Sequence, residues 1–180
     1  TDNLAPVCHD RLAQNGIDFE VHLKRSEDEL AALAGDFDGW IIRSGTTITA
    51  NLIDHAAKLQ VIGRAGVGVD NIDLEAATRK GILVVNAPDG NTISTAEHTC
   101  AMMQALARRI PHAHASVTAG EWARKQFSGA ELLGKTLGVV GVGKIGRAVA
   151  QRMQGFEMRV LGFDPVLGED AARRHGIELV

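Results

Sequence analysis

The sequence predicts an α/β protein with parallel sheets, and two observations support this expectation. Short apolar segments alternate with helical patterns along the 180 residues, which is typical of βαβ units. In addition, a strand-like run leads into a Gly-x-Gly-x-x-Gly loop followed by a helical pattern, between Leu137 and Gly146. We expect two domains, residues 1–89 and 90–180, because the turn Pro88–Asn91 separates two such alternating regions.

The first domain is expected to alternate between helices and short apolar strands. The predicted helices are Pro6–Gln14, Glu27–Ala34, Asn51–Lys58 and Leu74–Lys80. The predicted strands are Asp18–Leu23, Gly39–Arg43, Leu59–Gly63 and Ile82–Asn86.

Local signals place the ends of several helices. The sequences Ser26–Glu29 and Ser94–Glu97 have the capping-box pattern, so we expect each serine to open a helix. Gly16, Gly81 and Gly176 each precede an isoleucine, and each glycine suits the left-handed position that ends a helix. In each case the isoleucine is expected to begin the next strand.

A long helix is predicted after Ser94, with Pro111 interrupting it beyond Arg109. The stretch Thr118–Gly134 contains Trp122 among charges and glycines, and we expect a surface excursion there.

Composition excludes several classes of function. Apolar and charged contents of 45% and 23% are ordinary for a globular protein, and a net charge of −3 without a basic block argues against nucleic-acid binding. No apolar run is long enough to span a bilayer, and no signal peptide opens the chain. Cys8 and Cys100 do not make a disulfide framework, so we expect a reducing compartment, the cytoplasm.

The glycine loop predicts a dinucleotide site of the Rossmann type. Gly141 permits the tight turn, Gly143 lets the backbone approach a pyrophosphate, and Gly146 lets the helix lie close to the strand. Asp164 follows the next apolar strand, where it would accept hydrogen bonds from both ribose hydroxyls and repel a 2′-phosphate. The expected cofactor is therefore NAD rather than NADP. A purely structural glycine-rich turn is the alternative.

Several motifs together resemble the D-2-hydroxyacid dehydrogenase family. They are Ile42–Thr46, Val61–Asp73, Asn86–Glu97, and Leu133–Gly138 leading into the glycine loop. The run Asp73–Leu83 is similar to the branch of that family that acts on phosphoglycerate. The resemblance covers essentially the whole chain.

The resemblance implies NAD-dependent oxidation of 3-phospho-D-glycerate to 3-phosphohydroxypyruvate, the first step of serine biosynthesis. It also implies an incomplete, flavodoxin-like substrate-binding domain over residues 1–89, which lacks its first strand, and the first part of an NAD-binding Rossmann domain over 90–180. The implied assembly is a homodimer formed through the helix after Ser94, with a tetramer as a further option. A catalytic His, its carboxylate partner and an Arg are expected beyond Val180, so the chain is interpreted as an inactive fragment. The alternatives are a glyoxylate or hydroxypyruvate reductase, or an NAD-sensing, corepressor-like module.

The same resemblance suggests which residues contact ligands. Arg43 and Ser44 would face the substrate, the backbone of Gly66 and Val67 would meet its carboxylate near the cofactor, and Asn91 would contact it from the interdomain turn. Family members often have Thr in place of Val67, so a hydroxyl contact to the cofactor is lost here.

Lys144 and Ile145 lie between the last two glycines, where backbone N–H groups would bind the pyrophosphate.

Other residues keep two interpretations. Arg64 either contacts substrate or ties one loop to another. Arg124 and Lys125 either reach a substrate phosphate across a dimer interface or belong to a solvated loop. His112 and His114 point apart on a helix without further ligands nearby, so no metal site is predicted.

Overall fold

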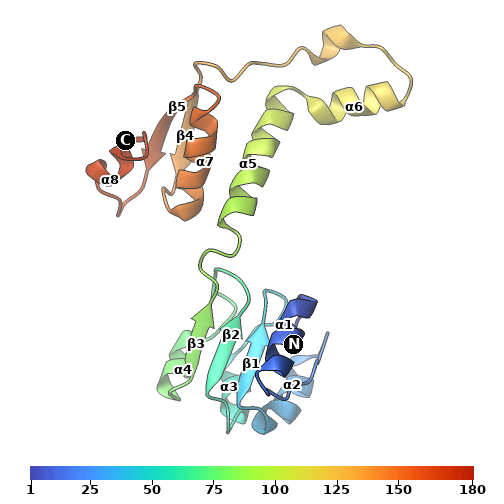
Figure 1. Ribbon diagram of the computed structural model, residues 1–180, viewed down its shortest axis with the longest axis vertical. Helices are drawn as coiled ribbons and strands as arrows, with labels where there is room; N and C mark the ends of the chain where they lie inside the picture. The colour runs from blue at the N-terminus through green and yellow to red at the C-terminus, as the bar shows by residue number, and fades with distance from the viewer. The chain divides into compact units, whose positions relative to one another are not determined.

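The computed structural model describes all residues 1–180, which form two compact units, Thr1–Asn91 and Thr92–Val180. Each unit contains one three-stranded sheet with helices packed on it (Figure 1). All strand pairs are parallel, so the predicted α/β class with two parallel sheets is confirmed. The units divide after Asn91, whereas the sequence placed the boundary after Asp89.

The first unit carries one helix between each pair of successive strands. Its elements are α1 (Pro6–Gln14), α2 (Glu27–Leu33), the 3₁₀ helix η1 (Ala34–Asp36), β1 (Gly39–Ile42), α3 (Ala50–His55), β2 (Val61–Arg64), α4 (Leu74–Arg79) and β3 (Leu83–Asn86). The strands lie in the order β1-β2-β3, and Ile42, Arg64 and Asn86 are in register. The carboxyl ends of the strands therefore meet at one edge, where the loops that follow them begin.

A continuous apolar core holds this unit together. Ile42 and Ile62 from the sheet and Leu52 and Ile53 from α3 have no exposed surface, and Ala77 of α4 packs into the same cluster. Burial of each large aliphatic side chain contributes about 1.5–3 kcal/mol. The core thus fixes the strand ends from which the edge loops emerge.

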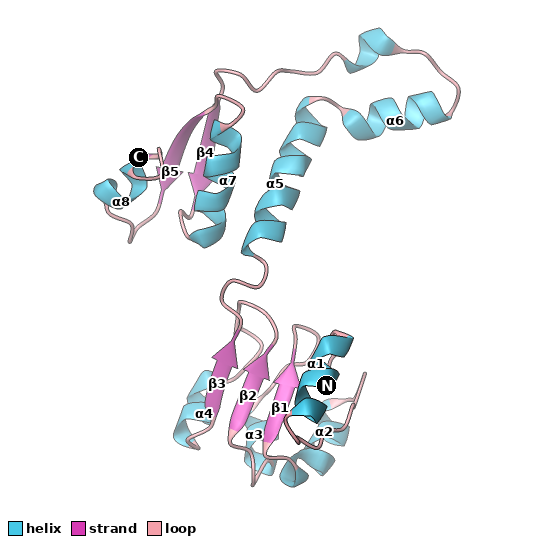
Figure 2. Ribbon diagram, in the orientation of Figure 1, coloured by secondary structure: helices cyan, strands magenta, loops and turns pink.

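The second unit begins with a long helix and continues into a second βαβ arrangement (Figure 2). Its elements are α5 (Thr92–Ala107), α6 (Ile110–Thr118), the 3₁₀ helix η2 (Arg124–Phe127), β4 (Thr136–Val140), α7 (Lys144–Gln154), β5 (Arg159–Phe163), α8 (Glu169–Arg173) and β6 (Glu178–Leu179). The strand order is β4-β5-β6. No helix in the chain has both the length and the apolar character needed to cross a membrane.

Helix α5 packs against α7 through a small apolar cluster. Ala96 and Cys100 of α5 are buried against Val149 and Met153 of α7. Arg152 of α7 adds an ion pair to Glu97 of α5, with 3.6 Å between nitrogen and oxygen. The two helices are therefore held together both by apolar packing and by a pair of opposite charges.

Several of the helix ends that the sequence predicted are confirmed. The Ser26 hydroxyl accepts the Glu29 N–H while the Glu29 carboxylate accepts the Ser26 N–H, so the predicted capping box opens α2. Gly16, Gly81 and Gly176 adopt φ values of 67°, 71° and 65°, as expected for glycines that follow a helix.

Two sequence predictions are wrong. Residues Asp18–Leu23 form no strand, so Ile17 does not begin one after Gly16, because no neighbouring strand pairs with this segment to complete a ladder. The long helix begins at Thr92 rather than after Ser94, so Ser94 lies within its first turn. The predicted break is present, since Arg109 is left-handed (φ 55°) and Pro111 occupies the first turn of α6.

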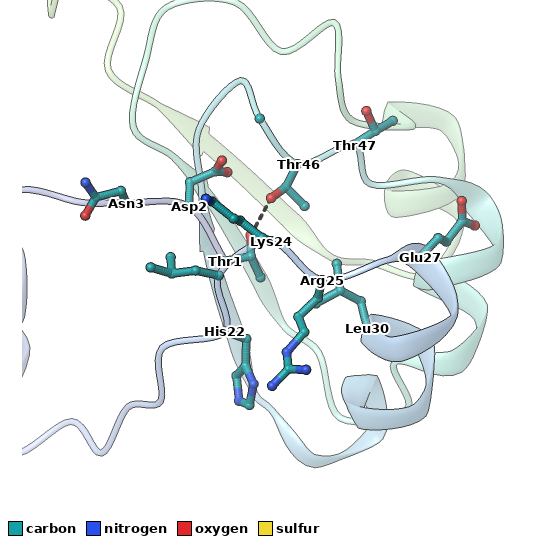
Figure 3. Close-up of a pocket in the computed structure, with 12 residues that line it drawn as sticks. Thr1, Asp2, Asn3, His22, Lys24, Arg25, Glu27, Leu30, Thr46 and Thr47 are labelled. Carbon is teal, nitrogen blue, oxygen red and sulfur yellow. Dashed lines mark hydrogen bonds between the residues drawn. The ribbon is translucent and has the colours of Figure 1, made fainter.

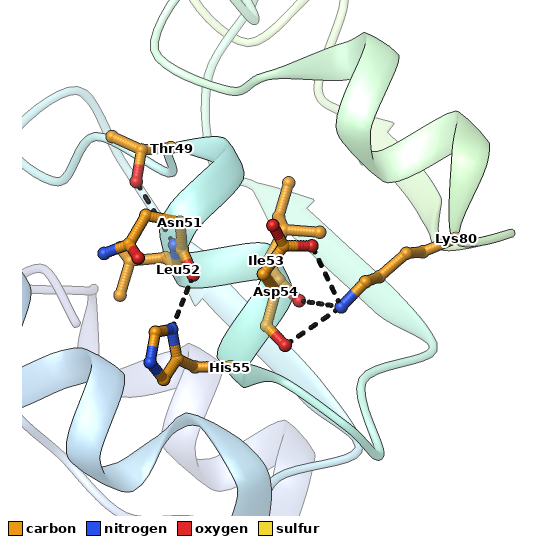
Figure 4. Close-up of polar contacts among 7 residues, drawn as sticks. All are labelled: Thr49, Asn51, Leu52, Ile53, Asp54, His55 and Lys80. Atoms are coloured by element: carbon orange, nitrogen blue, oxygen red, sulfur yellow. Dashed lines mark hydrogen bonds and ion pairs between the residues drawn. The ribbon is translucent and has the colours of Figure 1, made fainter.

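Both ends of the short helix α3 are held by side chains (Figure 4). At its start, the Thr49 hydroxyl accepts the Leu52 N–H at 3.2 Å. At its end, the Lys80 ammonium donates to the carbonyls of Ile53 (2.9 Å) and Asp54 (3.0 Å) and lies 3.3 Å from the Asp54 carboxylate. A cation at the helix C-terminus satisfies carbonyls that have no partner within the helix.

We expect Lys80→Met to lower the free energy of unfolding by about 1 kcal/mol, because two carbonyls lose a charged donor while the aliphatic stem is kept. Urea denaturation followed by circular dichroism measures this change. Lys58→Met, which alters an exposed lysine, is the matched control. Equal urea midpoints for the two variants would contradict the capping role of Lys80.

Candidate functional site

The glycine loop connects β4 to α7 through a backbone that only glycine adopts readily. Gly141 has a φ of 89°, and its N–H donates to the Phe163 carbonyl at the end of β5, at 2.8 Å. The side chain of the next residue, Val142, points into the core and is 1% exposed. The loop is therefore anchored at its first residues, and α7 begins immediately after Gly143.

The last two glycines of the motif differ in what surrounds them. A Cβ at Gly146 would overlap the Gly141 carbonyl oxygen and lie 3.1 Å from a methyl group of Val139, so α7 approaches β4 closely there. A Cβ at Gly143 would meet no atom within 4 Å, and its φ of −72° suits any residue. The fold itself therefore does not require glycine at position 143, and open space remains beside its backbone.

The N-terminus of α7 has the electrostatic character of an anion site. The helix runs from Lys144 to Gln154, and no side chain caps its first turn, because the cap residue is Gly143. No acidic residue lies in the first turn, which includes Ile145. The N-terminal N–H groups and the helix dipole favour a negative group at this position.

Asp164 ties the glycine loop to the end of β5. Its Oδ2 accepts the Val142 N–H at 2.8 Å, and its Oδ1 accepts the N–H groups of Val166 (2.9 Å) and Leu167 (3.0 Å). These hydrogen bonds, led by that from Val166, lower the pKa of the carboxyl, and nearby Arg147 adds a smaller effect. A carboxylate offers roughly four acceptor positions, and three of those of Asp164 are already used. The sequence predicted hydrogen bonds to both ribose hydroxyls, but only about one position remains.

A hollow of about 430 Å³ adjoins the glycine loop, and the sequence analysis did not predict it. Its walls come from α5, β4 and α7 and are Thr99, Met103, Leu137, Gly138, Val139, Val140, Gly141, Ile145, Gly146 and Val149. The only sequence signal was the spacing of Thr99 and Met103, which places both on one face of α5.

In the first unit, the predicted substrate residues follow the strand ends. Arg43 and Ser44 come directly after β1 and are exposed. The guanidinium of Arg43 makes one hydrogen bond, to the Asn3 carbonyl at 3.3 Å. Arg64 at the end of β2 folds its guanidinium against the backbone of Gly66, in the loop that directly follows it.

The loop after β2 is held through its carbonyl groups. The Asn86 side chain donates to the Val67 carbonyl at 2.6 Å, and the Ala87 N–H donates to the Gly66 carbonyl at 2.9 Å. The N–H groups of Val67 and Gly68 donate to no backbone carbonyl, and the Asp70 carboxylate lies close to Gly68, where a Cβ would overlap its Oδ1. Free consecutive N–H groups are the feature of a backbone anion nest.

The remaining candidate residues are Asn91, Arg124 and Lys125. Asn91 is the last residue of the first unit, and Arg124 and Lys125 lie in η2, where the Arg124 guanidinium is 5.6 Å from the centroid of the Trp122 ring. No group of three or more His, Cys, Asp or Glu side chains is arranged to hold a metal ion.

A second hollow, of about 440 Å³, lies in the first unit outside the predicted site (Figure 3). Asp2, Lys24, Arg25, Glu27 and Thr46 are among the residues that line it. Sequence reasoning singled out none of these residues as a ligand contact. Asp2 and Thr46 nevertheless border the turn that carries Arg43 and Ser44.

The chain is similar to known dehydrogenases over both units. A family model described as D-isomer specific 2-hydroxyacid dehydrogenase, catalytic domain, matches residues 1–154. The D-3-phosphoglycerate dehydrogenase of Rattus norvegicus is 51% identical over 178 residues, which are 99% of this chain and 33% of that protein. The chain thus spans about a third of the length of this relative.

Solved structures show the same likeness. The TT0316 protein from Thermus thermophilus superposes with a TM-score of 0.85 at 35% identity, covering 100% of this chain and 63% of the other. A D-lactate dehydrogenase from Aquifex aeolicus, complexed with NAD and lactic acid, superposes with a TM-score of 0.83 at 30% identity, covering 97% and 52%. The fold is therefore shared with dehydrogenase structures, including one that holds a nicotinamide cofactor.

Asp164 leads to a prediction about acid stability. Because its pKa is lower in the folded chain than the usual value of about 3.9, its hydrogen bonds stabilise the fold above about pH 4. This stabilisation is lost as the pH falls below about 4 through the lowered pKa. We expect the stability difference between wild type and Asp164→Asn to shrink between about pH 6 and about pH 3 in urea denaturation. A stability difference that stays constant over this pH range would contradict the stabilising role of the Asp164 hydrogen bonds.

Proposed function

The chain belongs to the D-isomer specific 2-hydroxyacid dehydrogenase family, and on this premise we propose that it is part of an enzyme that oxidises 3-phospho-D-glycerate to 3-phosphohydroxypyruvate with NAD. This reaction is the first step of serine biosynthesis. The observation that carries the proposal is the 51% identity to the rat D-3-phosphoglycerate dehydrogenase across 99% of the chain.

In this proposal the second unit holds the cofactor. NAD supplies the hydride acceptor for the carbon that bears the hydroxyl group. The turn at Gly141, the open backbone at Gly143 and the close helix approach at Gly146 suit a pyrophosphate lying against the start of α7. The N–H groups of Lys144 and Ile145 are the donors we assign to it.

Asp164 is assigned to the adenosine ribose. With three of its acceptor positions engaged by Val142, Val166 and Leu167, about one remains for a ribose hydroxyl. The same negative charge would repel a 2′-phosphate, which supports NAD over NADP.

The first unit supplies the substrate contacts in this proposal. Arg43 and Ser44 can bind an anionic group, because a guanidinium donates two parallel hydrogen bonds to a carboxylate or phosphate. The N–H groups at Val67, which follows Gly66, suit the substrate carboxylate, and Asn91 is assigned a further polar contact. We assign no catalytic acid or base to residues 1–180.

The second unit also supports a homodimer. Its helices α5 and α6 and the segment after them expose several large apolar side chains, which a second copy of the chain could cover. They are Ile93, Met102, Leu106, Ile110, Val117 and Trp122. Burial of these side chains against a second copy would remove them from water.

Substrate specificity is tested with the full-length protein and a panel of D-2-hydroxy acids. We expect kcat/KM for 3-phosphoglycerate to exceed that for glycerate and lactate by at least about tenfold. The reason is that the cationic side chain assigned to the substrate anion makes fewer charge-assisted hydrogen bonds to an acid without a phosphate. Equal or faster turnover of an unphosphorylated acid would instead identify a hydroxypyruvate or lactate type of dehydrogenase. NAD binding without turnover of any acid would favour an NAD-sensing module.

The cofactor site is tested with Gly143→Ala. A methyl group there meets no atom of the chain, so the fold should be unchanged. It would occupy the space assigned to the pyrophosphate, and we expect the Kd for NAD to rise by about tenfold or more. Gly168→Ala is the matched control, because Gly168 also caps a helix and its Cβ would also meet nothing within 4 Å. Equal NAD affinities of the two variants in calorimetry would refute the assignment.

A further inference from the structure

Arg43 lies in a turn that no strand ladder supports. β1 ends at Ile42, and residues 43–47 belong to no helix or strand. The Arg43 side chain is exposed and makes a single hydrogen bond of 3.3 Å, to the Asn3 carbonyl. The position of its guanidinium therefore depends on how the backbone of this turn is held.

The Asp2 carboxylate holds the turn from one side. Its Oδ2 accepts the Arg43 N–H at 2.7 Å. Its Oδ1 lies against Gly45, where a Cβ would overlap it. Figure 3 shows Asp2 beside Thr46 at the wall of the hollow described above.

The Asn71 side chain holds the turn from the other side. Its Nδ2 donates to the carbonyls of Arg43 (2.8 Å) and Thr46 (2.5 Å). The Asn71 backbone is itself fixed, because its carbonyl accepts the Ile48 N–H at 2.8 Å. Asn71 also ends the loop that contains Val67, so one side chain links the two loops assigned to the substrate.

We propose that Asp2 and Asn71 are positioning residues that together clamp the Arg43 peptide groups, N–H and C=O, and thereby aim the Arg43 guanidinium at the substrate anion. The proposal rests on the proposed function, because it takes Arg43 as a substrate contact. A turn that is ordered before binding loses less conformational entropy when the substrate arrives. Loss of the clamp should therefore weaken substrate binding rather than the chemical step.

The test uses the full-length protein and the acid of the panel that it oxidises fastest. We expect Asp2→Ala and Asn71→Ala each to raise the KM for that acid by about tenfold, while kcat and the KM for NAD change by less than about threefold. Asp2→Asn keeps an oxygen that can accept the Arg43 N–H, so its KM should stay within about threefold of wild type. Asn15→Ala is the control, because the Asn15 amide also donates to a backbone carbonyl, that of Arg11, away from the turn.

A double-mutant cycle with Arg43→Met separates positioning from general stabilisation. If the clamp acts through the Arg43 side chain, Asp2→Ala should add no further increase in KM to the Arg43→Met enzyme. Independent, additive increases would overturn the clamp while leaving Arg43 as a substrate contact. An unchanged KM for Arg43→Met would instead overturn the substrate role proposed for Arg43, and with it the clamp.

Thermal denaturation of each variant shows whether it is folded at the assay temperature. If Asn71→Ala does not fold, the comparison of Asp2→Ala with Asp2→Asn decides the proposal alone. Equal KM values for these two variants and wild type would refute it.

Discussion

Parallel pairing of the strands is the constraint on which both candidate regions depend. Parallel strands end at the same edge of a sheet, so the segments that follow β1 and β2 start side by side, as do those after β4 and β5. In the first unit this edge of the sheet collects Arg43 and Val67. In the second unit the corresponding edge of its own sheet collects the glycine loop and Asp164. Ligands in open α/β sheets bind outside the carboxyl ends of the strands for this reason.

The glycine motif combines requirements of the fold with one position that the fold does not explain. Gly141 is needed for its positive φ, and Gly146 for the close contact between α7 and β4. Gly143 satisfies neither need, since its backbone is ordinary and its surroundings are open. A glycine without a role within the chain is the position most directly explained by a bound group.

The sequence predicted the elements whose signals are local and missed the features that depend on distant partners. The capping box at Ser26 and the left-handed Gly81 follow from a few adjacent residues, and both are present. A strand at Asp18–Leu23 requires a neighbour that sequence periodicity cannot supply. The contacts of Asp2 and Asn71 with Arg43 span 41 and 28 residues, so no local pattern could reveal them.

Both units use the same physical device to hold a loop at a sheet edge. In the first, the Asp2 carboxylate accepts the Arg43 N–H just after β1. In the second, the Asp164 carboxylate accepts the Val142 N–H shortly after β4. A charged acceptor makes a stronger hydrogen bond to a backbone N–H than a neutral one does, and a short side chain has little freedom to lose. Acidic residues beside these loops can therefore order the backbone without contacting a ligand, and at Asp164 about one acceptor position stays free while the other three hold the loop.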